Sequence, residues 1–304
     1  MITTLAGKND FLIQRRLLQL TEKFLAAESD IALEKIDAAE TEFEALLDAV
    51  QSVPFLAQTK MVVVRGLAAN KLAAERIEQL IDSVAPTTEL IIVEPNPDKR
   101  TVYFKVLKER TQLEEFNELD VRQLAQWLVA EAKNQAANLT LADANYLVER
   151  LGPNQMMLAN ELDKLVTHEP KISRETIELL TEKNPQSKIF DLLDATFAGN
   201  KNKALELYEE QRAQKVEPQA IMALLAWQLQ VIALAKLGEG KTPGQIAQDS
   251  KMSPYPLTKA QSLARKISRV QLQQMIDEAL RIDYTSKTKG LDLDEALKTY
   301  ITTL

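Results

Sequence analysis

Two short runs rich in apolar residues, 61–65 and 89–93, stand out in the first third of the chain. Runs of this length that are rich in valine and isoleucine are typical of buried strands. Weaker patterns predict strands over 31–36 and 113–116 as well. Apolar residues spaced by three and four predict helices between the strands, over 11–27, 41–50, 73–84 and 102–109. Because strands that alternate with helices are typical of a parallel sheet, we predict an α/β domain over residues 1–117.

After Asp120 the apolar spacing is helical throughout. Asp120 and Thr140 precede two of the predicted helices and are residue types that favour the N-cap position. Further helices are predicted over 188–198, 200–215, 217–237, 256–267 and 269–283, with a short one over 292–303. A polar turn at 184–187 divides this part into all-α domains over 118–183 and 184–304. The predicted fold class is therefore α/β followed by all-α.

The composition is that of a soluble globular protein, with 45% of the 304 residues hydrophobic and 27% charged. The longest uninterrupted apolar runs are far shorter than the roughly 20 residues that span a bilayer. The N-terminus lacks the basic flank and apolar stretch of a signal peptide. We therefore expect a cytoplasmic protein without membrane contact. The absence of cysteine excludes disulfides, thiolate metal sites and a cysteine nucleophile.

The net charge of −7 is unevenly distributed. Residues 1–183 carry 21 Lys and Arg against 30 Asp and Glu, whereas residues 184–304 carry 16 against 14. Because phosphate binding needs clustered basic side chains, the acidic part is a poor candidate for nucleic-acid binding. We expect the main partners to be other proteins.

A basic stretch at 250–276 contains no acidic residue. Its basic residues are Lys251, Lys259, Arg265, Lys266 and Arg269. A solvated face or a subunit interface is favoured here, because the stretch has no compact arginine-rich motif. Contact with DNA is the alternative.

The loop that would hold nucleotide phosphates is missing from the predicted α/β domain. Only Gly7-Lys8-Asn9-Asp10 follows the first apolar run, which is too short and too poor in glycine to surround a triphosphate. A second candidate, Gly240-Lys241-Thr242, has Ala235 where a Walker A motif needs glycine. A long helix precedes it and Pro243 follows, so we predict a helix–helix loop.

The residues that end the two main strands do not suggest a metal site. In a P-loop ATPase an acidic residue would follow a strand such as 61–65, but here Arg65 stands in that position and would repel Mg²⁺. Glu94 ends the other strand without a neighbouring acid, and we interpret it as a surface glutamate. The only histidine, His168, is predicted to lie at a helix C-terminus. No catalytic residue, metal or cofactor is expected.

Phe55 and Leu56 are the candidate binding residues of the first domain. Adjacent residues on a helix or turn diverge by about 100°, so one core does not easily bury both side chains. Exposed neighbouring aromatic and aliphatic side chains are typical anchors for a partner's pocket. The alternative is that both side chains pack beneath the sheet.

Together these features resemble the delta subunit family of the bacterial DNA polymerase III clamp loader. The similar segments run in the family's order along the whole chain: Leu5–Leu12, Val53–Ala57, Lys60–Val64, Leu158–Leu165 and Ile189–Ala195, followed by Gly199 and Ala204-Leu205. Each segment alone is a weak signal, because most are apolar patterns. In combination with the missing phosphate loop they become fairly specific.

The resemblance implies three domains: an AAA+-like α/β module without a P-loop, a small helical lid, and a helical collar. It implies no ATP hydrolysis by this chain. It also implies that Phe55 and Leu56 bind the ring-shaped sliding clamp (beta) and help to hold one clamp interface open during replication. The collar would then contact the other clamp-loader subunits, and the assembled complex could contact primer–template DNA.

Two other functions remain open from the residues alone. One is a divergent nucleotide-binding ATPase that uses Lys8 and Glu94. The other is a helical adaptor whose last 120 or so residues bind a protein unrelated to replication.

Overall fold

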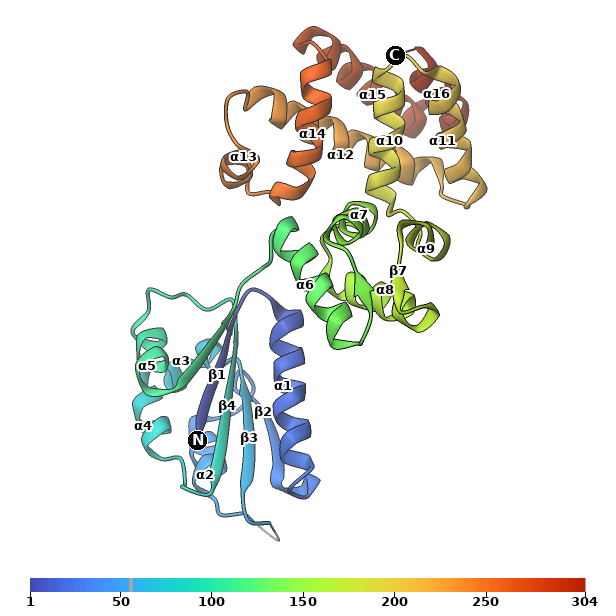
Figure 1. Cartoon of the computed structure of the whole chain (residues 1–304). Helices are drawn as coiled ribbons and strands as arrows, with labels where there is room; N and C mark the ends of the chain where they lie inside the picture. The colour runs from blue at the N-terminus through green and yellow to red at the C-terminus, as the bar shows by residue number, and fades with distance from the viewer. Residues whose placement is uncertain (55–56, 304) are drawn as a thin grey trace. The chain divides into compact units, whose positions relative to one another are not determined.

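The protein consists of two compact units, Met1–Leu119 and Asp120–Leu304 (Figure 1). This computed structural model describes residues 1–54 and 57–303. The first unit ends close to residue 117, where the α/β domain was predicted to end. The further division predicted after residue 183 falls within the second unit and stays a prediction.

The first unit is built on a parallel sheet, as predicted, and the sheet has five strands, one more than the four ranges assigned from the sequence. Its strands are β1 (Ile2–Gly7), β2 (Leu33–Asp37), β3 (Lys60–Arg65), β4 (Thr88–Pro95) and β5 (Gln112–Phe116). They lie in the order β2-β3-β4-β1-β5, and all neighbouring strands are parallel. This order places β1 between β4 and β5, and the carboxyl ends of all five strands meet at one edge.

Helices cover both faces of this sheet (Figure 1). They are α1 (Asp10–Leu25), α2 (Phe43–Gln51), α3 (Lys71–Glu75), α4 (Ile77–Asp82) and α5 (Val102–Arg110), with 3-10 turns η1 (Asp30–Ala32) and η2 (Leu67–Ala69). Val62 and Val64 of β3 share a core with α2, α4 and α5, whereas Met61 and Val63 share a core with α1. Since successive strand side chains point to opposite faces, the uninterrupted apolar run reflects burial on both faces.

The helix predicted over 73–84 is two helices, α3 and α4. The backbone of Arg76 leaves the helical region, with φ −108° and ψ 26°. Arg76 is therefore both the C-cap of α3 and the N-cap of α4. Its guanidinium lies 5.6 Å from the centre of the Phe43 ring. An apolar spacing that continues through this break is the reason that the sequence pattern did not show it.

The first part of the second unit contains four helices: α6 (Val121–Asn134), α7 (Leu141–Leu151), α8 (Gln155–His168) and α9 (Arg174–Leu180). The predicted N-caps are confirmed, because Asp120 accepts from the Gln123 amide and Thr140 from the Asp143 amide. The expectation of helix throughout was wrong in one place. Two short parallel strands, β6 (Asn138–Leu139) and β7 (Lys171–Ile172), pair with each other. Strands of two residues are too short to produce an alternating pattern.

The rest of the second unit is helical and shares one hydrophobic core. Its helices are α10 (Pro185–Phe197), α11 (Lys201–Ala213), α12 (Pro218–Leu237), α13 (Pro243–Ser250), α14 (Pro254–Lys266), α15 (Arg269–Lys289) and α16 (Leu293–Thr303). Helix α13 was not predicted, because Pro243 suggested a loop. Proline is compatible with the first helical position, and Thr242 forms a capping box with Gln245.

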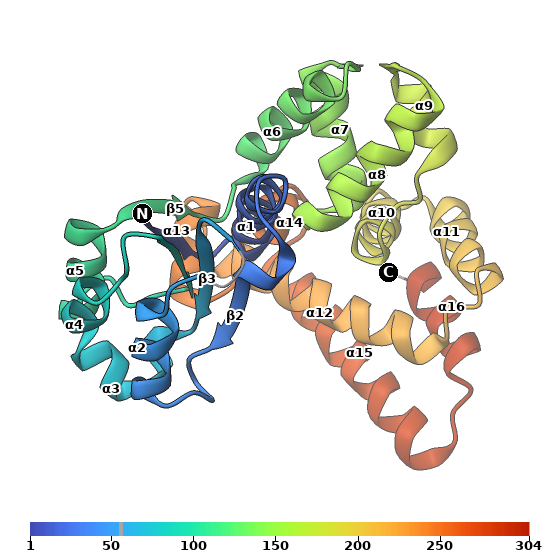
Figure 2. The same cartoon turned by 90° about the horizontal axis from the view of Figure 1, so that it is seen from below.

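By length and composition alone, helix α12 is long and apolar enough to cross a membrane. Only uninterrupted apolar runs were considered in the sequence, and polar residues interrupt the apolar residues of this helix. Its mean hydropathy over the best window is 1.7, and 44% of that window is buried inside the protein. Helices α14 and α15 pack against it (Figure 2). Its side chains Ile221, Leu225, Leu229 and Ile232 belong to the hydrophobic core. The apolar composition of α12 is accounted for by this central position.

Candidate functional site

The connection from β1 to α1 occupies the place where a P-loop protein binds phosphate. It consists of Lys8 and Asn9, and the polar groups of Asn9 are bound by the protein itself. The Asn9 side-chain oxygen accepts from the Leu12 amide at 3.0 Å, and the Asn9 amide donates to the Phe116 carbonyl at 3.1 Å. A Cβ on Gly7, whose φ is +137°, would lie 2.0 Å from the same carbonyl. The end of β5 therefore closes this loop, whereas a phosphate would need it open.

A pair of opposite charges lies beside that closed loop. Arg65, at the carboxyl end of β3, approaches the Asp10 carboxylate of α1 to 3.5 Å. Both side chains are largely exposed, so the pair contributes little to stability. Its relevance is chemical, because a guanidinium stands at the strand end where an ATPase would hold Mg²⁺. Lys8, two residues before Asp10 in the sequence, is exposed.

Glu94 is not the surface residue that the sequence suggested. Its side chain is 2% exposed at the carboxyl end of β4. It accepts a hydrogen bond from the Tyr103 hydroxyl at 2.6 Å and one from the Ala68 amide at 3.0 Å. Burial raises the pKa of Glu94, and the hydrogen bonds oppose that rise. The carboxylate therefore links β4 to η2 and α5, and the prediction failed because these partners are distant in sequence.

The predicted binding residues Phe55 and Leu56 lie outside the residues that the structure describes. Their described neighbours differ in exposure. Val53 is 77% exposed, whereas Ala57 packs against the core between the sheet and α1. Val53, before the predicted pair, thus lies at the surface of the unit, and Ala57, after it, lies at the core.

The remaining sequence candidates lie in the second unit. His168 ends α8, as predicted, and is exposed. Gly240-Lys241-Thr242 connects α12 to α13, where Lys241 pairs with Asp249 at 2.7 Å. Within the described residues, no group of three or more His, Cys, Asp or Glu side chains is arranged to hold a metal ion.

The basic stretch 250–276 is partly engaged inside the second unit. Lys266 pairs with Asp194 of α10 at 2.6 Å. The Lys259 ammonium donates to the Glu149 carbonyl at 3.1 Å, and its side chain is only 20% exposed. Lys259 is thus not part of a solvated face, whereas Arg265 and Arg269 are exposed.

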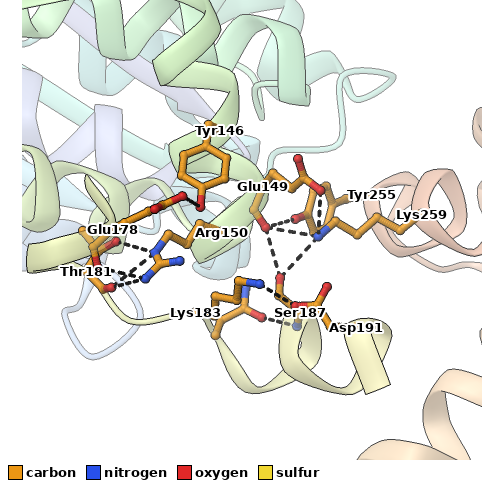
Figure 3. Close-up of polar contacts among 11 residues, drawn as sticks. Tyr146, Glu149, Arg150, Glu178, Thr181, Lys183, Ser187, Asp191, Tyr255 and Lys259 are labelled. Atoms are coloured by element: carbon orange, nitrogen blue, oxygen red, sulfur yellow. Dashed lines mark hydrogen bonds and ion pairs between the residues drawn. The ribbon is translucent and has the colours of Figure 1, made fainter. Parts of the chain in front are cut away.

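A polar junction forms where α7 meets α10 and α14, and sequence reasoning did not find it (Figure 3). The Glu149 carbonyl, near the end of α7, accepts from Ser187 at 3.0 Å, Tyr255 at 3.2 Å and Lys259 at 3.1 Å. Arg150 likewise donates to the Thr181 carbonyl at the end of α9, at 2.6 Å. Burial lowers the pKa of Lys259.

These cations stand at the carboxyl ends of two helices, where unpaired carbonyls and the helix dipole attract positive charge. A polar cavity of 430 Å³ lies beside them. Its basic residues already have protein partners, since Lys183 pairs with Asp191 and Arg174 with Glu178. The arrangement is therefore a structural junction between α7 and the helices that follow.

Comparison with known proteins agrees with this geometry along nearly the whole chain. A protein described as DNA polymerase III subunit delta from Bacillus subtilis (strain 168) is 24% identical, and the match covers 98% of this chain and 90% of that protein. A probable DNA polymerase III subunit delta from Aquifex aeolicus (strain VF5) is 23% identical over 99% of this chain and 90% of its own. The solved structure of the Bacillus subtilis DNA clamp loader delta protein has the same fold, with a TM-score of 0.79, 22% identity and coverage of 99% and 94%.

The fold and the closed loop define a class: an AAA+-like α/β module without a phosphate-binding loop in its described residues, joined to helical domains. The family model "DNA polymerase III, delta subunit" matches residues 4–117, and that of its C-terminal domain matches residues 186–304, together more than half of the chain. The chain belongs to the DNA polymerase III delta subunit family. Membership makes it a subunit of the clamp-loading complex.

Proposed function

We propose that this chain binds the sliding clamp through Phe55 and Leu56 and holds one interface of the ring open for loading onto primed DNA. ATP would be hydrolysed by other subunits. The observation that best supports the proposal is the closed β1–α1 connection. The Asn9 side-chain oxygen binds the Leu12 amide of α1, and the Asn9 amide binds the end of β5, against which Gly7 packs, so the module keeps an ATPase-like sheet without room for a phosphate at this loop.

The proposed mechanism is a shift between two states of the clamp. Two adjacent apolar side chains would fill a pocket next to a clamp interface, and polar neighbours would form the rim. Burial of two such side chains contributes roughly 3–6 kcal/mol before entropic costs. Binding that favours the open form of the ring changes its population without chemistry in this chain.

We also propose the assignments that the complex requires. Residues 118–183 act as a lid and residues 184–304 as a collar that contacts the other loader subunits in the cytoplasm. Any DNA contact from 250–276 would use Lys251, Arg265 and Arg269, since Lys259 and Lys266 have partners within the chain.

Clamp affinity of the variant Phe55→Ala plus Leu56→Ala tests the proposal. We expect binding of the purified sliding clamp to weaken at least about 100-fold, because about 3 kcal/mol of apolar burial is lost. The control is Leu18→Ala plus Val102→Ala, which removes exposed apolar side chains elsewhere on the same unit. This control should bind as the wild type does. Unchanged affinity of the first variant would refute the assigned contact.

A further inference from the structure

Glu28, in the turn after α1, holds the end of the segment that follows Phe55 and Leu56. One oxygen of its carboxylate accepts from the Thr59 amide at 3.1 Å and the Thr59 hydroxyl at 3.0 Å. The other oxygen accepts from the Gln58 amide at 3.2 Å. The Glu28 amide donates to the carbonyl of Phe24, a buried residue of α1, at 2.9 Å. Both carboxylate oxygens of Glu28 thus accept hydrogen bonds from two consecutive residues, Gln58 and Thr59.

Lys60 holds the other end of the same segment. Its ammonium donates to the Ala49 carbonyl at 3.0 Å and to the Ser52 hydroxyl at 2.8 Å, where α2 ends. It also pairs with Glu34 of β2 at 2.7 Å, and its side chain is 13% exposed. A lysine that binds the last carbonyls of a helix fixes the direction in which the chain leaves it.

These contacts hold described residues on both sides of Phe55 and Leu56 in the sequence: Ser52 before them, and Gln58 and Thr59 after them. Val53, which follows Ser52, is 77% exposed. Fixed ends reduce the number of conformations that a short connection must lose when it docks, which improves affinity without a new contact.

We infer that Glu28 is a positioning residue for clamp binding: its carboxylate fixes Gln58 and Thr59, which follow the proposed binding pair, and Lys60 fixes Ser52, which precedes it. The inference rests on the proposed function, because it concerns how the same contact is presented. Glu28 lies 30 residues before Gln58 and itself need not touch the clamp. Its effect on binding would pass through the segment that carries Phe55 and Leu56.

The test uses Glu28→Gln in the full chain, with Glu22→Gln on α1 as the charge-matched control. Glutamine offers one acceptor oxygen where the carboxylate offers two, so it does not satisfy all three donors. We expect the Gln58 and Thr59 amides to exchange hydrogen about tenfold faster in the free subunit. Binding of purified sliding clamp should weaken about tenfold, or about 1.4 kcal/mol. Glu22→Gln should change neither quantity.

A double-mutant cycle with Leu56→Ala separates positioning from general destabilisation. If Glu28 acts through the pair, Glu28→Gln should cost less affinity in the Leu56→Ala background than in the wild type. An equal loss in both backgrounds would overturn the positioning role. If Glu28→Gln does not fold, Thr59→Val removes only the hydroxyl bond and should give a two- to threefold loss.

The two measurements keep this inference distinct from the proposed function. Unchanged exchange at Gln58 and Thr59 would overturn the role of Glu28 whatever the clamp does. Faster exchange with unchanged clamp affinity would show that Glu28 holds Gln58 and Thr59 but does not support clamp binding, which would overturn the positioning role. Normal clamp binding by Phe55→Ala plus Leu56→Ala would refute the proposed contact, and the positioning role with it, even if exchange responds as expected.

Discussion

At the carboxyl end of β4, Glu94 brings a carboxylate into the core of the first unit. Its side chain is 2% exposed and accepts hydrogen bonds from the Tyr103 hydroxyl and the Ala68 amide. Burial raises the pKa of Glu94 above its ordinary value of 4.5. The same burial, with the nearby carboxylate, raises the pKa of Tyr103. One residue therefore joins a strand, a turn and a helix at the edge of the sheet where an ATPase would work.

Two substitutions of Glu94 should distinguish the contribution of its hydrogen bonds to the unfolding free energy from that of its charge. Glu94→Ala leaves the Tyr103 hydroxyl and the Ala68 amide without an acceptor and should cost about 2–3 kcal/mol of unfolding free energy. Glu94→Gln keeps an acceptor oxygen and avoids the burial of a charge, so its cost at neutral pH should be about 1 kcal/mol or less. Urea denaturation of the full chain measures both. A larger loss for the glutamine variant would contradict this account.

The pH dependence of the Glu94 contribution has a definite sign. Between the ordinary pKa and the raised one, the folded protein binds more protons than the unfolded chain. The stabilisation is therefore fully present below pH 4.5 and is lost as the pH rises through the raised pKa. The unfolding free energy of the wild type minus that of Glu94→Gln should fall as pH increases across this window. A difference that grows with pH would exclude the raised pKa.

At the scale of helices and strands, local signals were enough to predict most elements. Asp120 and Thr140 cap their helices as predicted, because an N-cap and the apolar spacing after it lie within a few residues. One prediction was wrong because it depended on distant partners. Strand β6 pairs with β7, and the Asn138 amide donates to the Pro170 carbonyl at 2.7 Å across about 30 residues. Helix α13 was missed for another reason: Pro243 suggested a loop, but proline also fits the first turn of a helix.

The candidate site was predictable to a similar extent. The short Gly7–Asp10 connection could be recognised from sequence, because a phosphate loop has a fixed length and glycine pattern. The burial of Glu94 could not, since it requires Tyr103 and Ala68 to meet at one sheet edge. The same holds for Glu28, whose partners at Gln58 and Thr59 are brought to it only by the fold.

The junction at the end of α7 gives an element-scale prediction. Lys259→Met keeps the apolar stem near the rings of Phe190 and Tyr255 but removes the ammonium that binds the Glu149 carbonyl. Because Ser187 and Tyr255 still donate to that carbonyl, the loss of unfolding free energy should be about 1–2 kcal/mol. Urea denaturation followed by circular dichroism provides the measurement.

The matched control is Lys266→Met, whose partner Asp194 is half exposed. Exposed ion pairs contribute little, so its effect should be about 0.5 kcal/mol or less. Equal effects of the two substitutions would mean that the α7 junction is no more important than a surface pair.

At the scale of the whole molecule, an ATPase-like sheet has its β1–α1 connection closed by β5, while Ser52 and Thr59 are held by Lys60 and Glu28 before β3. The first feature removes a place for nucleotide at this loop, and we propose that the second helps to present a contact with another protein. The family assignment places both features in a clamp-loading complex. We propose that this subunit acts on the clamp by binding alone.

The most direct test is the rate at which closed sliding clamps leave circular DNA when only this subunit is added. The account predicts faster release that needs no ATP, is unchanged when ATP is added, and disappears in the Phe55→Ala plus Leu56→Ala variant. Release that is not accelerated, or that is accelerated only when ATP is present, would contradict it.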